Sequence, residues 1–499
     1  MLCLGIDSGT QSTKALVLDL DSGKVLAQAR QRYGMIEALP PGHMEQDPAT
    51  WIEAAETAVA ECLGKIGERT REICAVGVSG QQHALVALDE AGDPLRPAKL
   101  WCDLSTEAQC EELNREFDGP EGLIERIGNP MQPGYTAPKL LWLKENEPAN
   151  FRRLTSILLP HDYLNLWLTG ERQMEYGDAS GTGLMDVRTR KWYQPILKFI
   201  GPDLESMLPP LRSSKRPAGL LRSVLREKWG LADDALVSAG SGDNMMSSIG
   251  TGNIRAGLVT VSLGTSGTVC AYAAEPVIDP KGEVAAFCDA TDHWLPLTCT
   301  MNMAGPTEQM RELLSWDIPT MEQRLAAAPA GADGILFLPY LQGERTPNLP
   351  KASGVFHGLT TANMTPDCMA RAVVEGVTLG LAYGLRRFKD LGIVPEEIRL
   401  TGGGSKSAAW RQIAADVLGF PTVALQVPEG AALGAAIQAG WTYCQVKGKP
   451  LSLEELVDNL VVVEKKTRVE PGKKSSALYS ELLLKRIDLT KKLKSAGYL

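Results

Sequence analysis

The sequence lacks the short motifs that mark the commonest nucleotide and metal sites. It has no GxxxxGK[ST] loop, no GxGxxG opening the helix of a βαβ unit, and no HExxH. The five histidines lie far apart along the chain, and the ten cysteines form no CxxC pair. These absences exclude a P-loop NTPase and a Rossmann dinucleotide site, and they argue against a metalloenzyme whose metal is held entirely by protein ligands.

An excess of positive charge is also missing. The formal net charge is −9, which argues against a general nucleic-acid surface and favours small-molecule partners. Asp7 interrupts the first apolar run, and no uninterrupted apolar stretch approaches the length that spans a bilayer. The scattered cysteines are typical of reduced core residues. We therefore expect a cytoplasmic protein that binds neither nucleic acid nor membrane.

The chain is too long for one ordinary hydrophobic core. With 499 residues, of which 44% are hydrophobic, two domains of about 200 to 250 residues are expected. We place the first domain at residues 1–250 and the second at 251–445, followed by a C-terminal extension at 446–499. The extension carries Leu478, Leu482, Leu489 and Leu493 at helical spacing, which predicts a surface helix whose lysines form a solvated face.

A turn rich in glycine and hydroxyl groups, from Asp7 to Lys14, lies between two apolar runs near the start of the chain. Taken alone, such a turn is an ordinary hairpin connection. A similar turn follows Ser262, however, and Gly264-Thr265 repeats Gly9-Thr10. Repeated turns predict a duplicated fold in which the two turns face each other across a cleft and offer backbone N–H groups to phosphates. Only the first turn has a carboxylate, Asp7, that could hold a cation.

Two further strand ends lead into glycines. The apolar stretch 236–242 runs into Asp243 and a helix of small residues, and the stretch 398–401 runs into Gly402 to Gly404. Aspartate at a helix start is most often an N-cap. Phosphoryl transfer to a hydroxyl, however, needs a carboxylate to accept the proton, a metal on the phosphates and donors for the transferring oxygens. Asp243, Asp7 and the two Gly-Thr turns would supply that set.

Other polar residues at strand ends have two interpretations. Gln82 and His83 follow a buried strand at 73–79, where a histidine is more often structural than ligand-binding. Trp101 is either a core residue or, with Asp103, part of a sugar pocket. Further helices are expected near 49–64, 137–144, 162–168, 307–314, 366–389 and 431–439, the last of which is made of small residues suited to close packing.

The whole chain resembles the FGGY carbohydrate kinases, whose fold is that of the actin-like ATPases. The resemblance predicts an α/β protein of two duplicated actin-like ATPase (ribonuclease H-like) domains with a cleft between them. Its markers occur in family order as Gly5-Ile6-Asp7-Ser8-Gly9-Thr10, Gly80-Gln81-Gln82-His83, Leu100-Trp101-Cys102-Asp103, Pro133-Gly134-Tyr135-Thr136-Ala137-Pro138-Lys139, Leu159-Pro160-His161-Asp162-Tyr163, Gly242-Asp243-Asn244, Ser262-Leu263-Gly264-Thr265, Gly343-Glu344-Arg345-Thr346-Pro347 and Gly402-Gly403-Gly404.

The resemblance also implies roles for individual residues. Asp243 would be the catalytic base, and Asp7 would lie beside Mg²⁺ and the γ-phosphate. The ATP-binding residues would be Thr10, Gln11, Lys14, Gly264, Thr265, Gln309, Gly403 and Gly404, and the sugar-binding residues would be Gln82, His83, Trp101, Asp103, Asp243 and Asn244. The implied activity is ATP-dependent phosphorylation of the terminal hydroxyl of a ketopentose, D-xylulose foremost, by a homodimer whose sugar is held mainly by the first domain.

The chain departs from the family pattern at two positions. Gln82 stands where members acting on D-xylulose usually have methionine, which makes the sugar site more polar. Cys368 replaces a polar residue at the start of a helix, where it affects local capping. A kinase for ribulose or glycerol is therefore an alternative within the class. From another class, the alternative is an actin-like ATPase without sugar kinase activity, which would need neither the base nor the sugar lining.

Overall fold

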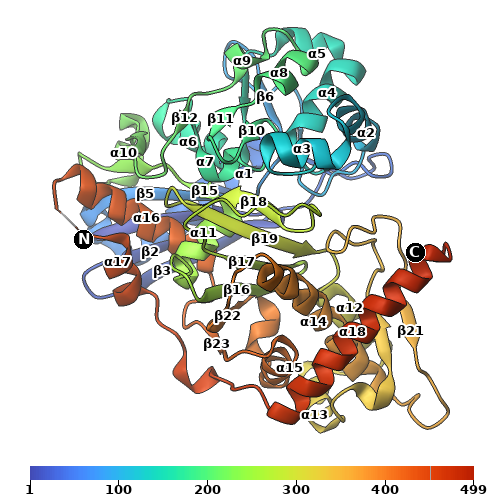
Figure 1. Ribbon diagram of the computed structural model, residues 1–499. Coiled ribbons are helices and arrows are strands. Elements are labelled where there is room, and N and C mark those ends of the chain that lie inside the picture. Colours follow the sequence, from blue (N-terminus) through green and yellow to red (C-terminus); the bar gives the residue numbers. More distant parts are fainter. Residues whose placement is uncertain (450) are drawn as a thin grey trace.

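The computed structural model describes residues 1–449 and 451–499. Each half of the chain builds one large sheet, and Figure 1 shows the two halves as an upper lobe in blue and green and a lower lobe in yellow, orange and red. Helices cover both sheets, so the α/β class expected from the sequence is confirmed.

The first sheet grows outward from the N-terminal strand. Strand β1 pairs antiparallel with β2, which pairs antiparallel with β3, and on its other side β1 pairs parallel with β5. β14 continues the parallel part and β13 closes the edge antiparallel. The strands are β1 (Leu2–Ser8), β2 (Ser12–Asp19), β3 (Lys24–Arg32), β5 (Ile73–Gly80), β13 (Pro217–Leu220), β14 (Leu236–Ser238) and β15 (Ser241–Gly242), the last of which pairs with β5.

The second sheet repeats this arrangement. β16 pairs antiparallel with β17 and parallel with β22, as β1 does with β2 and β5. Ser262 lies beside Thr401 in the same register that places Asp7 beside Ser79. The duplication inferred from the two turns is therefore confirmed. The strands are β16 (Leu258–Leu263), β17 (Gly267–Ala271), β18 (Ala285–Cys288), β19 (Trp294–Thr300), β22 (Glu397–Thr401) and β23 (Thr422–Ala424).

Helix α16 (Gly430–Val446) crosses between the two halves. It belongs by sequence to the second half, yet it packs on β1, β5 and on α11 (Asp243–Thr251) of the first. A Cβ on Gly5 would lie 2.0 Å from the Ala432 carbonyl oxygen, and one on Gly434 would lie 1.8 Å from that of Met246. The small residues of α16 therefore permit the close packing expected from the sequence, against the neighbouring domain.

The remaining helices and short strands complete the two lobes. In the first half they are α1 (Pro48–Ile66), α2 (Glu107–Glu116), α3 (Gly119–Ile127), α4 (Thr136–Asn146), α5 (Pro148–Arg153), α6 (Pro160–Thr169), α7 (Tyr176–Ala179), α8 (Gln194–Ile200), α9 (Leu204–Met207) and α10 (Ser223–Trp229), with the strand pairs β4 (Glu45–Gln46) and β7 (Ala98–Lys99), β6 (Val86–Leu88) and β8 (Ser156–Leu158), β9 (Met174–Glu175) and β12 (Leu211–Arg212), and β10 (Met185–Asp186) and β11 (Lys191–Trp192). In the second half they are α12 (Ala304–Leu313), α13 (Ile318–Ala327), α14 (Pro366–Asp390), α15 (Ala408–Leu418), α17 (Leu453–Leu460), α18 (Lys473–Ser495) and the pair β20 (Leu336–Leu338) and β21 (Val355–His357).

Two long helices form the centre of the second lobe. α14 is long and apolar enough to cross a membrane, but 89% of its most apolar segment is buried inside the protein. It is therefore the core helix of this lobe. Thr365 caps this helix by accepting a hydrogen bond from Cys368 N. α18 packs across α14 and α15 with Tyr479 and Arg486 buried, so it has an inner face as well as the solvated one inferred from its lysines.

Two strands expected from the sequence are shorter in the structure. The stretch 236–242 is interrupted at Gly240, whose φ of 70° bends the chain between β14 and β15. The stretch 98–103 forms only the two-residue strand β7, after which the chain turns at Trp101. In both cases the apolar residues mark burial, and the turn that follows comes earlier than their composition indicates.

Candidate active site

The two Gly-Thr turns line a single cleft between the lobes. The cleft has a volume of about 540 Å³, and the first turn, the second turn and Asp243 all contribute to its wall. Thr401, at the end of β22, adds the third glycine-rich strand end. The structure thus brings together parts of the chain that lie almost 400 residues apart.

The first turn carries the only carboxylate of the pair. Asp7 accepts a hydrogen bond from Ser79 Oγ at 2.9 Å, and its other oxygen lies 3.6 Å from Lys14 Nζ. Burial raises the pKa of Asp7, although the charge of Lys14 and the Ser79 hydroxyl oppose the shift. Lys14 also pairs with Glu429 at 2.6 Å. Burial alone would lower the pKa of Lys14, but Asp7 and Glu429 outweigh it and raise that pKa, so Lys14 stays a cation.

The first turn is held rigidly by its neighbours. Trp101 Nε1 donates to Thr10 Oγ1 at 2.9 Å, and this hydroxyl donates to Gln81 Oε1 at 3.2 Å. Gln46 Nε2 donates to the Thr10 carbonyl at 2.7 Å. Gln11 is exposed on the cleft wall. A turn fixed in this way presents its backbone donors without further ordering, which is what a phosphate site requires.

The second turn is more open and has serine, Ser262, at the position of Asp7. Gly264 and Thr265 line the cleft, and Thr265 is exposed. Gly402 packs directly behind this turn, with a φ of 79° and room for no side chain: a Cβ would lie 2.7 Å from the Leu263 carbonyl carbon. The third glycine turn therefore supports the second one from behind.

Asp243 is the first residue of α11, and Gly242 occupies the N-cap position. The N-cap interpretation of Asp243 is therefore wrong: its carboxylate faces the cleft instead of capping the helix. Asn244 Nδ2 donates to Asp243 Oδ1 at 2.9 Å and to Gln82 Oε1 at 2.8 Å. Burial, followed by the charges of Asp7 and Asp178, raises the pKa of Asp243 to about 7. Such a pKa suits a general base near neutral pH.

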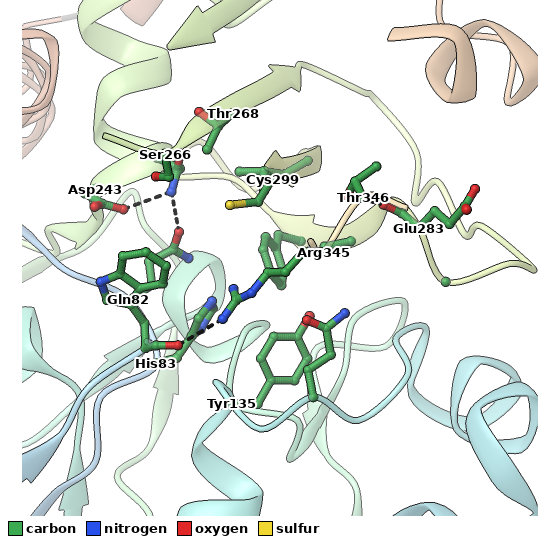
Figure 2. Close-up of a pocket in the computed structure, with 17 residues that line it drawn as sticks. Gln82, His83, Tyr135, Asp243, Ser266, Thr268, Glu283, Cys299, Arg345 and Thr346 are labelled. Carbon is green, nitrogen blue, oxygen red and sulfur yellow. Dashed lines mark hydrogen bonds between the residues drawn. The ribbon is translucent and has the colours of Figure 1, made fainter. Parts of the chain in front are cut away.

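A smaller pocket of about 110 Å³ adjoins the cleft, and Asp243, Asn244 and Trp101 line both. Figure 2 shows Gln82, His83 and Tyr135 on one side of this pocket and Cys299, Arg345 and Thr346 on the other. The carboxylate of Asp243 thus lies where a molecule in the small pocket and a molecule in the cleft would meet.

His83 lies in this pocket with a constrained backbone. Its φ is 63°, and its carbonyl accepts from Lys139 Nζ at 2.8 Å and from Thr136 Oγ1 at 3.1 Å. Its ring packs on Tyr135 and Phe287, with centroids 5.1 and 5.5 Å away. Burial, with the charges of Lys139 and Arg345, keeps the pKa of His83 well below its usual range. The imidazole is therefore neutral, and it lines the small pocket.

His161, Asp162 and Asp178 form a buried polar network near the site. His161 pairs with Asp178 at 2.7 Å and with Asp162 at 3.0 Å, and these carboxylates hold the pKa of His161 well above its usual range in spite of burial. The charge of Asp178 is one of the causes that raise the pKa of Asp243. Through Asp178, this buried network therefore influences the protonation of the Asp243 carboxylate.

Four of the residues predicted for the site line neither the cleft nor the small pocket. Asp103 is fully buried and accepts hydrogen bonds from Met44 N at 2.8 Å and Lys99 Nζ at 3.2 Å, so it braces the loop that carries Trp101. Gln309 is exposed on α12 and does not line the cleft. Gly402 separates Gly403 and Gly404 from the cleft residue Thr401, and neither of these two glycines lines the cleft. Gly403 is exposed with open space where a side chain would be, whereas Gly404 is buried against Leu263 and Trp410.

The sequence interpretation missed several residues of the small pocket. Tyr135 and Arg345 belong to the motifs Pro133-Gly134-Tyr135 and Gly343-Glu344-Arg345, which carried the resemblance without being given a role. Phe287 and Cys299 are strand residues of the second lobe and have no local signal. The second lobe therefore supplies one wall of this pocket, and the expectation that the sugar is held mainly by the first domain stays a prediction.

Arg345 connects the lobes at the mouth of the pocket. Its guanidinium donates from Nη2 to the Trp101 carbonyl at 3.0 Å and lies 5.4 Å from the centre of the Trp101 ring (Figure 2). Together with the Lys14–Glu429 pair at 2.6 Å, it joins the walls of the site across the cleft.

Comparison with known proteins finds sugar kinases that are similar to this protein along almost the whole chain. A xylulose kinase of Haemophilus influenzae is 41% identical over 94% of this chain and 95% of its own length. A crystal structure of a xylulose kinase from Brucella ovis superimposes with a TM-score of 0.91 at 31% identity, covering 99% of this chain and 100% of the other. A gluconate kinase structure from Lactobacillus acidophilus gives a TM-score of 0.90 at 26% identity, over 99% of this chain and 98% of that one.

The match to one family covers both halves. Residues 2–250 match the N-terminal domain of the FGGY family of carbohydrate kinases, and residues 259–443 match its C-terminal domain. The duplicated sheets, the paired turns and the carboxylate between two pockets are the features that such an enzyme needs. The chain therefore belongs to the FGGY family of carbohydrate kinases.

Proposed function

We propose that this protein transfers the γ-phosphoryl group of ATP to the terminal hydroxyl of D-xylulose, giving D-xylulose 5-phosphate and ADP. Similarity to several xylulose kinases along most of the chain supports the substrate. The observation that carries the reaction type is the position of Asp243 at the junction of the cleft and the small pocket.

In this proposal ATP occupies the cleft with its phosphates between the two Gly-Thr turns. Thr10, Lys14, Gly264 and Thr265 donate to the phosphate oxygens, and the adenosine lies toward Gly403 and Gly404. The exposed side chain of Gln11 adds a donor at the rim. Since phosphoryl transfer depends on positioning and charge stabilisation, the rigid first turn and the cationic Lys14 are the main contributions of the chain here.

The ketose occupies the small pocket with its terminal hydroxyl beside Asp243. The carboxylate takes the hydroxyl proton while the oxygen bonds to the γ-phosphorus and the bond to the β,γ-bridging oxygen breaks. Asn244 holds Asp243 in place through its 2.9 Å hydrogen bond. Trp101, Gln82 and the neutral His83 orient the sugar, and Arg345 helps to exclude water, which otherwise competes as acceptor.

Asp7 fits a role in Mg²⁺ binding. It is a single carboxylate beside a phosphate turn, and Mg²⁺ in kinases is held by one or two carboxylates together with phosphates and water. When bound, the ion would neutralise phosphate charge. Asp7 would hold it, with Ser79 fixing one carboxylate oxygen at 2.9 Å.

The sugar preference has one specific alternative. Gln82 lines the small pocket where family members acting on D-xylulose usually have methionine. A polar amide at this position fits a sugar hydroxyl group, so ribulose, or a polyol such as glycerol, is the second candidate. Assembly as a cytoplasmic homodimer and domain limits at 250 and 445 remain predictions from the sequence.

The test compares Asp243→Ala and Asp243→Asn with the unchanged protein. Both variants should bind ATP with unchanged affinity by calorimetry and lose sugar phosphorylation by several orders of magnitude, because the proton acceptor is gone. ADP release is measured with D-xylulose, D-ribulose and glycerol. Near-normal turnover in either variant would contradict the base assignment, and ATP hydrolysis indifferent to every sugar would favour an ATPase.

A further inference from the structure

A separate pocket of about 260 Å³ lies between helix α18, helix α14 and the loop at residues 347–349, and four positively charged residues line it. They are Arg486, Lys491 and Lys494 on α18 and Lys281 in the loop before β18. The protein as a whole has a formal net charge of −9, so this concentration of positive charge is local. No step of the proposed reaction uses it.

Arg486 is the inner wall of this pocket and is only 2% exposed. Its guanidinium contacts neutral groups, the Gly376 carbonyl and, at 3.5 Å, the Tyr340 hydroxyl. Within residues 1–449 and 451–499, no carboxylate lies within 4.0 Å of it. A buried charge ordinarily has a counter-ion. Two other buried arginines of this lobe follow that rule: Arg371 pairs with Glu375 at 2.5 Å and Arg387 with Asp279 at 2.8 Å.

The three lysines around the pocket are also free of ion pairs in the described part of the chain. Lys492, the next residue after Lys491 on the same helix, differs from these lysines because it forms an ion pair with Asp488 at 2.7 Å. Glu283 is the one acid in the pocket wall, and it is already engaged by Arg387 at 3.0 Å and by the Tyr383 hydroxyl at 2.8 Å. The nearby carboxyl of Glu344 is influenced by the charge of Arg486, but burial raises the pKa of Glu344 to about 7. Among the described residues, the pocket therefore has an excess of positive charge that no ion pair neutralises.

We propose that this pocket binds a phosphate-bearing small molecule of about the size of a sugar phosphate. Arginine and lysine are the side chains that recognise phosphate, and a concave site with aromatic and apolar walls encloses a small ligand. Tyr340 and Tyr383 supply such walls. A purely structural role for Arg486, tying α18 to α14, accounts for its contact with Gly376 but leaves the three unpaired lysines without a function.

One loop connects this pocket to the sugar site. Glu344 and Leu349 pair across its base, and between them Arg345 and Thr346 line the small pocket of the active site. The next residues, 347–349, line the basic pocket, and Glu283 lines both. A ligand in the basic pocket would therefore contact the loop that positions Arg345. We expect its binding to change the KM for the sugar.

The experiment measures binding of inorganic phosphate and of glucose 6-phosphate by calorimetry at constant ionic strength, without turnover, so it does not depend on the proposed reaction. The test variant is Lys281→Ala/Lys491→Ala/Lys494→Ala, and the matched control is Lys492→Ala on the same helix. All four lysines are exposed, so the variants should fold. The triple variant should bind the tighter probe at least tenfold more weakly, and the control should bind it as the unchanged protein does.

Lysine labelling with an acetylating reagent locates the bound probe. Glucose 6-phosphate should protect Lys281, Lys491 and Lys494 while Lys492 reacts at its original rate. Protection by glucose 6-phosphate alone identifies a phosphosugar, and equal protection by inorganic phosphate identifies free phosphate. Unchanged affinity in the triple variant, or no protection by either probe, would overturn the site. Binding without any change of the sugar KM would retain the site and overturn the coupling.

Discussion

At the scale of single residues, the raised pKa of Asp243 suits it to act as a base but destabilises the folded protein when the carboxylate is ionised. Burial and the nearby charges of Asp7 and Asp178 raise its pKa to about 7. The same neighbours that make the carboxylate a competent base also disfavour its ionised form in the folded protein. Activity and stability should therefore depend on pH in opposite directions around neutrality.

Turnover should rise with pH through the titration of Asp243. Because a general base acts in its deprotonated form, kcat/KM for the sugar should fall about tenfold per pH unit below an apparent pKa of about 7. A rate profile from pH 5.5 to 8.5 at saturating ATP measures this. A profile that stays flat down to pH 5.5 would contradict an Asp243 base with a raised pKa.

The stability of the fold should respond with the opposite sign. The pKa of Asp243 is raised in the folded protein from 3.8 to about 7, so the folded state binds this proton more tightly than the unfolded state. The resulting contribution is fully present below pH 3.8 and is lost as pH rises through about 7. At pH 8, Asp243→Asn should therefore be more stable by roughly 2 kcal/mol, because the carboxylate is partly exposed and its shift is discounted for solvent. Urea unfolding at pH 8 measures the gain, and equal stability of variant and parent would contradict it.

At the scale of elements, the contact between α16 and α11 depends on glycine. A Cβ on Gly434 would lie 1.8 Å from the Met246 carbonyl oxygen, a backbone atom that cannot move without shifting a helix. Gly434→Ala should therefore lower the free energy of unfolding by about 3 kcal/mol. The matched control is Gly64→Ala, because Gly64 lies exposed in α1 with nothing within 4 Å of the added carbon.

The control should raise stability by up to about 1 kcal/mol, since alanine is the better helix former. The measurement is the thermal unfolding temperature of both variants and of the unchanged protein. If Gly434→Ala unfolds at the temperature of the unchanged protein, the close packing of α16 on α11 is not as described here.

Individual helices and hairpins were the part of the fold that the sequence predicted best. The helix that Thr365 caps, the small-residue helix after Gly430 and both glycine-turn hairpins follow from local patterns that tertiary contacts reinforce. The strand ends at 98–103 and 236–242 were too long in the prediction, because apolar composition reports burial and does not report where the chain turns.

At the scale of the whole molecule, the site exists only where the two lobes meet. Arg345 reaches from the second lobe to the Trp101 carbonyl at 3.0 Å. Arg345→Ala removes this connection and one wall of the sugar pocket, so the KM for the sugar should rise about tenfold while ATP binding is unchanged. Arg345→Lys keeps the charge but loses the planar fork, and it should show an intermediate KM.

Initial rates at varied sugar concentration, with ATP saturating, measure both variants. The proposed position of Arg345 at the mouth of the pocket would be wrong if the alanine variant lowered kcat and left the KM for the sugar unchanged.

This scale also explains why the candidate site was only partly predictable. Asp7, Asp243 and the turns have local signatures, so the sequence pointed to them. Phe287, Cys299 and Arg345 join Gln82 and His83 only after the second lobe folds against the first, and no local pattern reports that contact. Asp103 lies two residues after Trp101, but the strand has already ended at Lys99 and the chain turns there, so Asp103 points inward and is buried against Lys99.

The crossing of α16 has a consequence for how the protein is made. The first lobe precedes the second along the chain, but α16, which covers β1 and β5, is complete only at Val446. Contacts between residue 5 and residue 432 are among the most distant in sequence that the chain forms. During synthesis, at about 5 to 20 residues per second, the apolar face of the first sheet therefore stays uncovered for about 20 seconds or more. The first lobe is the earliest to be translated and among the last to be completed, so chaperones and proteases have their longest access to it.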